Sequence, residues 1–444
     1  MPSSHPLPPS CHWFSRLASA LDPRSAPRLA WLLVGAVLAR GRRTVTSWIR
    51  AAGLSAEFRP CYTTVSAVGK RTDLMAAHLA HEVVKPLVAG SERLTFALDD
   101  TPTQRYGPHV QGAGVHHNPA PGPAGSPFVY GHVWVVLGLL ARHPVWGVIA
   151  LPLLARLYVR QKDLSGIAPK HRPVFRTKLE MAVELVRWAV SWLGHLGKPV
   201  WVVADGAYAK APFLKPMRAL AVTVVSRLRR DSALWTVPGP RLPHRRGPNR
   251  IYGEHRIDLA KRAGQKRGWA TGPFDLYGKP TEKKYKTFVA TWRPAGGAIR
   301  VVLVDEPKGW VAFFCTNPDA TVADILGCVA DRFSLEIAFR DVKEVVGAGQ
   351  QQVRFVQASI GAFHVCLWTF TMTEAWAWKR DEKELAGHRS ASPWDDLARR
   401  PSHADKRRAW RRELLGNEIR AVLLAGATEQ ELQAAAERLL NLAA

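Results

Sequence analysis

The first part of the chain has the apolar pattern of helices. The residues from about Ser15 to Leu87 predict several helices, and the stretch Leu29–Leu38 is strongly apolar. Thr44 can cap a short helix because its hydroxyl can accept a hydrogen bond from the first backbone amides. Gly53 can end that helix. The first region is therefore predicted to be helical.

A different pattern begins at Leu94, where short apolar runs alternate with helical segments. In chain order the predicted elements are strands at Leu94–Leu98, Val129–Leu140 and Val145–Leu157, a helix at Lys178–Leu193, a strand at Val200–Ala204, a helix at Ala209–Ala219 and a strand at Ala221–Ser226. An antiparallel meander that leads into alternating helices and strands predicts a ribonuclease H-like α/β fold with a mixed sheet. A doubly wound sheet would lack the opening meander. In the predicted fold the first and fourth strands are neighbours.

A β-rich basic insertion interrupts this order. Its second half predicts strands at Lys286–Trp292, Ile299–Val304 and Val311–Cys315. A helix capped by Thr321 or Asp319 follows from Val322, and the rest of the chain is mostly helical. The predicted organisation is a helical region (1–90), the first part of the core (91–226), the insertion (227–321), a core helix (322–352) and a helical C-terminal region (353–444).

The net charge is strongly basic. The sequence has 62 Lys and Arg against 36 Asp and Glu, a formal charge of +26. A long basic chain most often has a polyanion partner, because neutralising phosphates releases condensed counterions. The excess is uneven, since Arg241–Arg267 holds nine Lys and Arg against two acids. The charge favours nucleic acid over a basic composition without a partner. The N-terminal helices are then either a DNA-binding unit or an ordinary bundle.

The sequence predicts a cytoplasmic protein without a membrane partner. The five cysteines lie far apart and form no Cys-x-x-Cys pair, which fits a reducing compartment. Met1–Ser10 lacks the basic and apolar pattern of a signal peptide. Gly131–Val159 is apolar, but Arg142-His143-Pro144 splits it into halves too short to span a bilayer. Two buried strands are the better interpretation.

Three segments hold acids that suit metal-dependent chemistry. Asp99 and Asp100 follow the first core strand, Asp205 follows the fourth, and Glu336 lies on the core helix. Singly these are weak signals, because such an Asp is commonly a turn or cap residue. Together, two neighbouring strands and a helix can converge on a pair of metal ions, as phosphodiester cleavage requires. Mg²⁺ takes oxygen ligands and needs one or two carboxylates per ion.

Two cations accompany Glu336 on the predicted helix. Arg332 precedes it by four residues and Lys343 follows it by seven. These offsets are close to whole helical turns, so the three side chains lie along one stripe. A carboxylate flanked by cations can hold a metal while the cations hold neighbouring phosphates. The alternative is a surface ion pair, with Asp341 and Glu344 diluting the positive charge.

These segments resemble the cut-and-paste DDE transposases of bacterial insertion sequences, in the group with a Y-R-E-K signature. That group has a D-x-[S/T] turn after the first strand and a D-[R/G]-x-[F/Y] segment after the later one, which Asp99-Asp100-Thr101 and Asp205-Gly206-Ala207-Tyr208 match. The tyrosine position of the signature holds Val329. The signature helix matches at Arg332, Phe333, Leu335, Glu336, Phe339 and Lys343. A β-rich insertion before the glutamate is a further mark of the group.

The resemblance implies a DNA transposase. Such an enzyme binds the terminal repeats of its element, nicks the DNA to free 3′ hydroxyls and joins those ends to target DNA. It implies Asp99, Asp205 and Glu336 as the catalytic residues and as ligands of two Mg²⁺ ions, for which Mn²⁺ can substitute. Arg332 and Lys343 would bind DNA phosphates. A homodimer in the DNA complex and a bacterial, nucleoid-associated location are implied as well.

Several alternatives stay open at the level of sequence. The spacing to Thr101 favours Asp99 over Asp100 as the ligand, but strand alternation does not decide between them, because the preceding residues on both faces are apolar. Arg241–Arg267 either follows the DNA backbone, with Trp269 as a stacking group, or is a disordered basic loop. The function could instead be that of a structure-selective nuclease on the same fold, or of a non-catalytic DNA-binding protein derived from a transposase.

Overall fold

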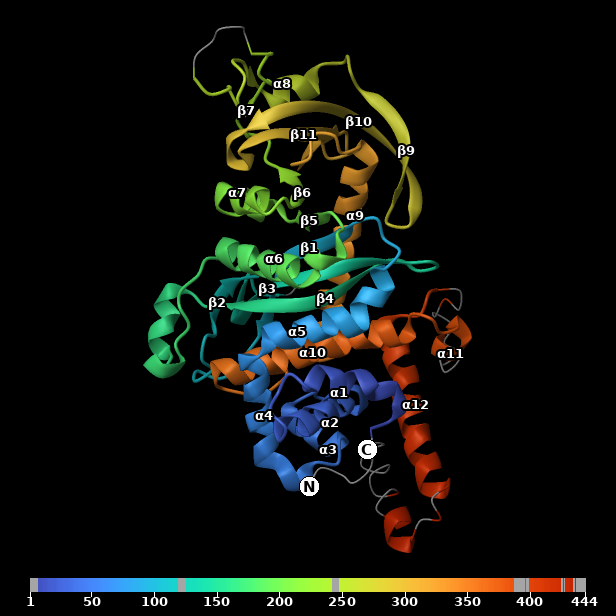
Figure 1. The fold of residues 1–444 in the computed structure, drawn as a ribbon. Coiled ribbons are helices and arrows are strands. Elements are labelled where there is room, and N and C mark those ends of the chain that lie inside the picture. Colours follow the sequence, from blue (N-terminus) through green and yellow to red (C-terminus); the bar gives the residue numbers. More distant parts are fainter. Residues whose placement is uncertain are drawn as a thin grey trace.

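The computed structural model describes residues 7–118, 125–241, 247–386, 396, 399–424, 426, 428–433 and 436. Within this part of the chain, Figure 1 shows three tiers: a helical body, a sheet covered by helices, and a strand-rich insertion at the far end. Residues 242–246 of the predicted basic segment and residues 387–395 of the predicted helical C-terminal region lie outside the described residues.

Helices from both ends of the chain pack into the helical body. They are α1 (His12–Ala18), α2 (Ser25–Leu38), α3 (Val45–Ala51), α4 (Phe58–Lys70), α5 (Thr72–Leu79), α10 (Val356–Ala377), α11 (Glu382–Ala386) and α12 (His403–Leu424). The central helix α10 contacts α2, α4 and α12 and also packs against the sheet. Nearly all of its residues are buried for that reason.

Two glycines allow the backbones of α4 and α10 to cross at close distance. A Cβ added to Gly69 would lie 1.9 Å from the carbonyl oxygen of Gln357, and one added to Gly361 would lie 1.9 Å from that of Val65. Only a residue without Cβ allows two helix backbones to approach this closely. The contact between the N-terminal and C-terminal helices therefore depends on these two positions.

Short helical turns connect the elements of the helical body. They are η1 (Pro9–Cys11), η2 (Ser55–Glu57), η3 (Ala80–Val84) and η4 (Lys85–Val88). Thr44 caps α3 as predicted, because its hydroxyl accepts from Ser47 N at 3.1 Å. Gly53 follows with a positive φ of 71°, which favours glycine at the end of this helix.

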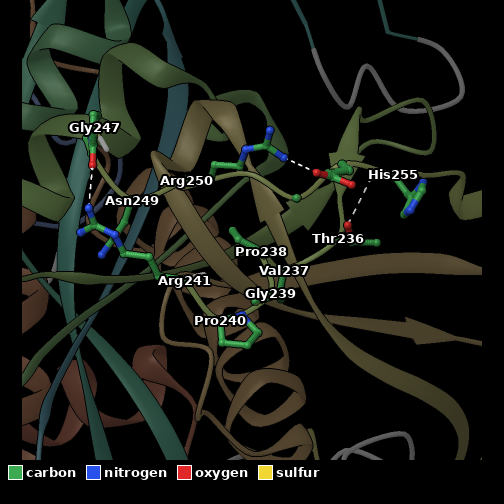
Figure 2. A pocket seen from close by; sticks show the side chains of 13 residues that line it. Thr236, Val237, Pro238, Gly239, Pro240, Arg241, Gly247, Asn249, Arg250 and His255 are labelled. Atoms are coloured by element: carbon green, nitrogen blue, oxygen red, sulfur yellow. Dashed lines mark hydrogen bonds and ion pairs between the residues drawn. The ribbon is translucent and has the colours of Figure 1, made fainter. Parts of the chain in front are cut away.

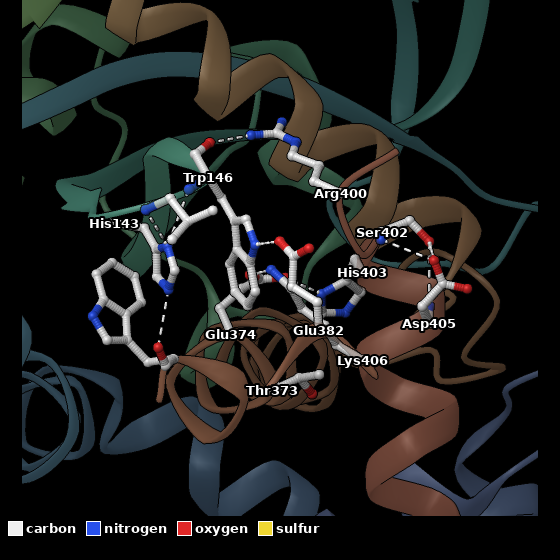
Figure 3. A network of polar contacts seen from close by, with 12 residues as sticks. His143, Trp146, Thr373, Glu374, Glu382, Arg400, Ser402, His403, Asp405 and Lys406 are labelled. Carbon is white, nitrogen blue, oxygen red and sulfur yellow. Dashed lines mark hydrogen bonds and ion pairs between the residues drawn. The ribbon is translucent and has the colours of Figure 1, made fainter. Parts of the chain in front are cut away.

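A buried polar network attaches α12 to α10 and to the turn between the long strands (Figure 3). Glu374 on α10 accepts from Lys406 Nζ at 2.5 Å and pairs with His403 Nδ1 at 2.7 Å. The Lys406 ammonium also lies 4.1 Å from the centre of the Trp146 ring. On the other side, His143 Nε2 lies 2.9 Å from the carbonyl oxygen of Trp378. The network joins three segments that are distant in the sequence.

The core sheet has the predicted order. Its strands are β1 (Leu94–Gln104), β2 (Gly114–His117), β3 (Phe128–His143), β4 (Gly147–Tyr158), β5 (Val200–Ala204) and β6 (Thr223–Leu228). The strands β4, β3, β1, β5 and β6 are neighbours in that order. β1, β5 and β6 run parallel, and β3 runs antiparallel to β1 and β4. The ribonuclease H-like α/β fold is thereby confirmed.

Helices and short turns complete this part of the core. They are α6 (Lys178–Leu193), α7 (Ala211–Ala219), η5 (Gln161–Gly166), η6 (Pro169–His171), η7 (Gly194–Leu196) and η8 (Gly206–Tyr208). The bounds of α6 are those predicted, and Thr177 and Glu180 cap its start reciprocally. Gly131–Val159 forms β3 and β4, as expected. Among the described residues, no helix is long and apolar enough to cross a membrane.

The first strand is longer than predicted. The sequence suggested a turn at Asp99–Thr101, but β1 continues to Gln104. The reason is its antiparallel partner β3, which pairs with β1 as far as Gln104. The parallel partner β5 stops earlier, with Ala204 opposite Leu98. Asp99 and Asp100 therefore lie within a strand, at the point where its parallel neighbour ends.

The insertion continues the core sheet. Its elements are β7 (Leu234–Trp235), β8 (Arg256–Ile257), α8 (Leu259–Gly264), β9 (Ala270–Leu276), β10 (Lys279–Trp292), η9 (Arg293–Ala295), β11 (Gly297–Val304) and β12 (Val311–Cys315). β12 pairs antiparallel with β6, and β11 and β10 follow outward. The chain then returns through α9 (Val322–Glu344), whose first turn is capped by Thr321 and Asp324. α9 contacts β1, β3, β4 and the β9 strand of the insertion.

Candidate active site

Asp99 and Asp205 lie side by side at the end of β5. Leu98 and Ala204 are opposite each other in the parallel pair β1–β5, so the next residue of each chain segment is an acid. Asp205 Oδ2 accepts from Ala207 N at 2.9 Å and caps the short turn η8. The predicted meeting of the first and second acids follows directly from this register.

Arg332 on α9 connects Asp99 with Glu336. One guanidinium nitrogen bonds to Asp99 Oδ2, and the other donates to Glu336 Oε1 at 2.7 Å. Asp99 and Arg332 are mostly buried, with 17% and 19% of their side chains exposed, whereas 42% of the Glu336 side chain is exposed. The structure thus brings the third predicted acid to the first through a shared cation.

Burial dominates the acidity of Asp99. It raises the pKa of the carboxyl from 3.8 to about 7, although the charge of Arg332 and a hydrogen bond from the backbone of Asp100 act to lower it. The carboxylates of Asp100 and Asp205 raise this pKa further. The charged form of a buried carboxyl with two acids beside it is stabilised by any cation that neutralises the three acids. In this structure that cation is Arg332.

Asp100 points to the opposite face of the sheet, as alternation along a strand requires. Its carboxylate accepts from Lys178 Nζ at 2.5 Å and from the Tyr208 hydroxyl at 3.2 Å. Burial and the nearby carboxylates raise the pKa of Tyr208 well above its usual value. Asp100 therefore lies within a strand and is not a turn residue. Its partners on α6 and η8 were missed, because spacing along the chain carries no signal for Lys178.

Lys343 lies farther along the same stripe of α9, near the end of the helix. Its Nζ donates to the Thr101 hydroxyl at 3.3 Å. Burial lowers the pKa of Lys343, and the charge of Glu344 opposes that effect. Thr101 is two residues beyond Asp99 on the same face of β1. The predicted stripe of Arg332, Glu336 and Lys343 therefore follows β1 on the side of Asp99.

Comparison with protein families places this chain in a known group. Residues 16–271, more than half of the chain, match the model of the DDE superfamily endonucleases. The chain belongs to the DDE superfamily. Residues 176–371 of this DDE enzyme also match the transposase DDE domain. Asp99 and Asp205 lie in the first match, and Asp205 and Glu336 lie in the second. A comparison with curated proteins gives no match.

The donor set of this DDE enzyme has the chemistry that a hard divalent cation requires. Asp99, Asp205 and Glu336 offer carboxylate oxygens, the ligands preferred by Mg²⁺ and Mn²⁺. In the described part of the chain, no three His, Cys, Asp or Glu side chains come close enough together to hold an ion. Arg332 bonds instead to two of the three acids. A cation that binds Asp99 and Glu336 would compete with that guanidinium for the same oxygens.

The basic insertion of this DDE enzyme holds a separate hollow. It has a volume of about 520 Å³ and lies between the segments Thr236–Arg241 and Gly247–His255 (Figure 2). Arg250 in its wall pairs with Glu254. The hollow shares no lining residue with the acid site. Trp269, the candidate stacking group of this segment, lies beneath Lys284 and Lys286, whose ammonium groups are 5.4 and 5.0 Å from its ring centre.

Proposed function

We propose that this DDE enzyme is a transposase that cuts DNA at the ends of its element and joins the freed 3′ hydroxyls to target DNA. Asp99, Asp205 and Glu336 are the catalytic residues of this proposal. The observation that supports it best is the adjacency of Asp99 and Asp205 on parallel strands, with Glu336 tied to Asp99 through Arg332. Acids at neighbouring strand ends opposite a helix suit phosphodiester chemistry.

The same three acids would hold the metal ions. Bound there, two Mg²⁺ ions, or Mn²⁺ in their place, would activate the attacking hydroxyl and stabilise the leaving oxygen. Asp205 stays close to Asp99 because β1 and β5 are hydrogen-bonded up to Leu98 and Ala204. Released from Asp99, the Arg332 guanidinium is free to pair with a phosphate of the DNA, as its two-pronged geometry favours. Lys343 would hold the next phosphate along the stripe.

The experiment compares Glu336→Gln and Asp205→Asn with Glu344→Gln. Glu344 is exposed on the same helix, so its variant removes the same charge outside the site. The substrate is a plasmid that carries the DNA flanking the coding region, incubated with Mg²⁺, Mn²⁺ or EDTA. Loss of one ligand should lower the rate on the order of 10³-fold, since metal stabilisation contributes several kcal/mol. The Glu344 variant should cut like the wild type.

The products distinguish a transposase from the alternatives. Metal-dependent cleavage followed by joining of the ends to a second DNA supports the proposal, whereas cleavage without joining indicates a nuclease. Full activity of Glu336→Gln would refute the assignment of the site. Binding of the same DNA without cleavage at any metal concentration would indicate a non-catalytic DNA-binding protein. A homodimer that joins two ends should sediment as a two-copy complex when DNA is present.

A further inference from the structure

A groove leads away from the acid site along the end of β1. Its first part, about 1050 Å³ in volume, begins at Lys343, which contacts Thr101, and extends past Gln104 to Arg42 of the helical body. A second hollow of about 440 Å³ shares part of its lining with the first and extends to Arg354. We call this continuous depression the glutamine groove, after Gln104, Gln350 and Gln352 in its walls.

The charge of the glutamine groove has one sign. Arg42, Arg105, Lys343 and Arg354 line it, and no Asp or Glu does among the described residues. Arg42 and Arg354 are exposed, so their guanidinium groups are accessible from solvent. Arg105 is buried and bonds to His132 and to the backbone of Gln351. A groove lined by cations without carboxylates suits a polyanion.

The uncharged residues of the groove suit bases better than phosphates alone. Gln104 and Gln352 are exposed, and a glutamine amide can donate and accept at once, as pairing with an adenine edge requires. Tyr106 lines the same groove and is 67% exposed. An aromatic side chain so placed can stack on a base. The combination of cations, amides and one aromatic ring favours nucleic acid over a simple anion.

The walls of the groove are held together although they come from three distant segments. Gln350 Oε1 accepts from Arg43 N at 2.7 Å, and Gln351 Nε2 donates to the carbonyl oxygen of Arg43 at 2.9 Å. Gly349, with a φ of 97°, would place a Cβ 3.3 Å from the carbonyl oxygen of Gln104. The loop after α9 therefore fits between β1 and the helical body. Such preorganisation lowers the entropic cost of binding.

We propose that the glutamine groove binds the stretch of DNA that continues from the phosphate cut at the acid site. Arg42, Arg354 and Lys343 neutralise its phosphates. Gln104 and Gln352 read base edges, and Tyr106 stacks on one base. The groove thus couples sequence recognition at the element end to the position of the cut. This inference rests on the proposed function, since it takes DNA as the substrate.

The first test measures the salt dependence of binding to a fluorescein-labelled random-sequence duplex in EDTA, where no cleavage occurs. Each lost phosphate contact changes the slope of log K against log salt by about 0.9. The double variant Arg42→Ala, Arg354→Ala should therefore lower the magnitude of this slope by about 2. The control pair is Arg187→Ala with Arg420→Ala, two exposed residues that do not line the groove. Equal slopes for both pairs would refute the groove as a DNA site.

The second test selects DNA from a randomised duplex library. The wild-type protein should enrich one sequence from the library. The double variant Gln104→Ala, Gln352→Ala should lose the base preference at one or two adjacent positions, with discrimination between bases falling about 5- to 150-fold per lost base contact. An unchanged preference, or none in the wild type, would overturn base reading by the groove. Both tests measure binding alone. If Glu336→Gln keeps full cleavage activity, the acid site of the proposed function is refuted, whereas normal binding and selection by the groove variants refute only this inference.

Discussion

Replacing Glu374 by glutamine should loosen the attachment of α12. The Glu374 side chain is 4% exposed and that of Lys406 is 5% exposed, and the two charged groups are 2.5 Å apart. Glutamine can keep a hydrogen bond to His403 but cannot neutralise the Lys406 ammonium. Removing one partner of a buried ion pair costs about 3–5 kcal/mol, because the other charge remains uncompensated. This is a large share of the ~5–15 kcal/mol that stabilises a typical domain.

Acid should loosen the same attachment. Burial raises the pKa of the Glu374 carboxyl, but Lys406 and His403 outweigh that effect and lower this pKa from 4.5 to about 2. A carboxyl with a lowered pKa in the folded state contributes stability that is complete above the unfolded value and is lost as the pH falls through the folded value. Release of α12 is therefore expected between about pH 4.5 and about pH 2, and Glu374→Gln should lose part of this pH dependence.

Hydrogen–deuterium exchange of residues 403–424 measures the attachment directly, because α12 can open without global unfolding. A loss of about 3 kcal/mol corresponds to exchange roughly 10²-fold faster. Adding Lys406→Met should restore much of the protection, since neither buried charge remains. Glu384→Gln is the control, because 60% of this side chain is exposed and such surface pairs contribute little. Exchange of Glu374→Gln within about threefold of the wild type would refute this reasoning.

Three further predictions test other parts of the structure. Gly361→Ala should lower the melting temperature by several degrees, because overpacking costs about 1–3 kcal/mol, whereas Gly327→Ala, with open space around its Cβ, should not. Tyr106→Ala should weaken binding of a labelled single-stranded oligonucleotide about tenfold and Tyr106→Phe should restore it, because the ring provides the stacking; equal loss in both would contradict stacking. In the plasmid assay Asp99→Asn should abolish cleavage while Asp100→Asn keeps most of it, and the reverse result would exchange their roles.

The order of elements along the chain was sufficient to predict the fold of the core and the meeting of two acids. Hydrophobic periodicity indicates the strands and helices locally, and right-handed crossovers leave few ways to arrange a meander followed by alternating helices and strands. The adjacency of Asp99 and Asp205 then follows from the parallel pair β1–β5. The stripe of Arg332, Glu336 and Lys343 follows from helical geometry alone.

Only the tertiary structure decided where β1 ends and what each acid contacts. Its extension to Gln104 depends on pairing with β3, and the opposite environments of Asp99 and Asp100 depend on which helix covers each face. The glutamine groove likewise exists because the loop after α9 contacts Arg43 and β1. Periodicity shows which face of an element is buried. It does not show which distant segment buries it, because that choice is made by packing and hydrogen bonds between segments far apart in the chain.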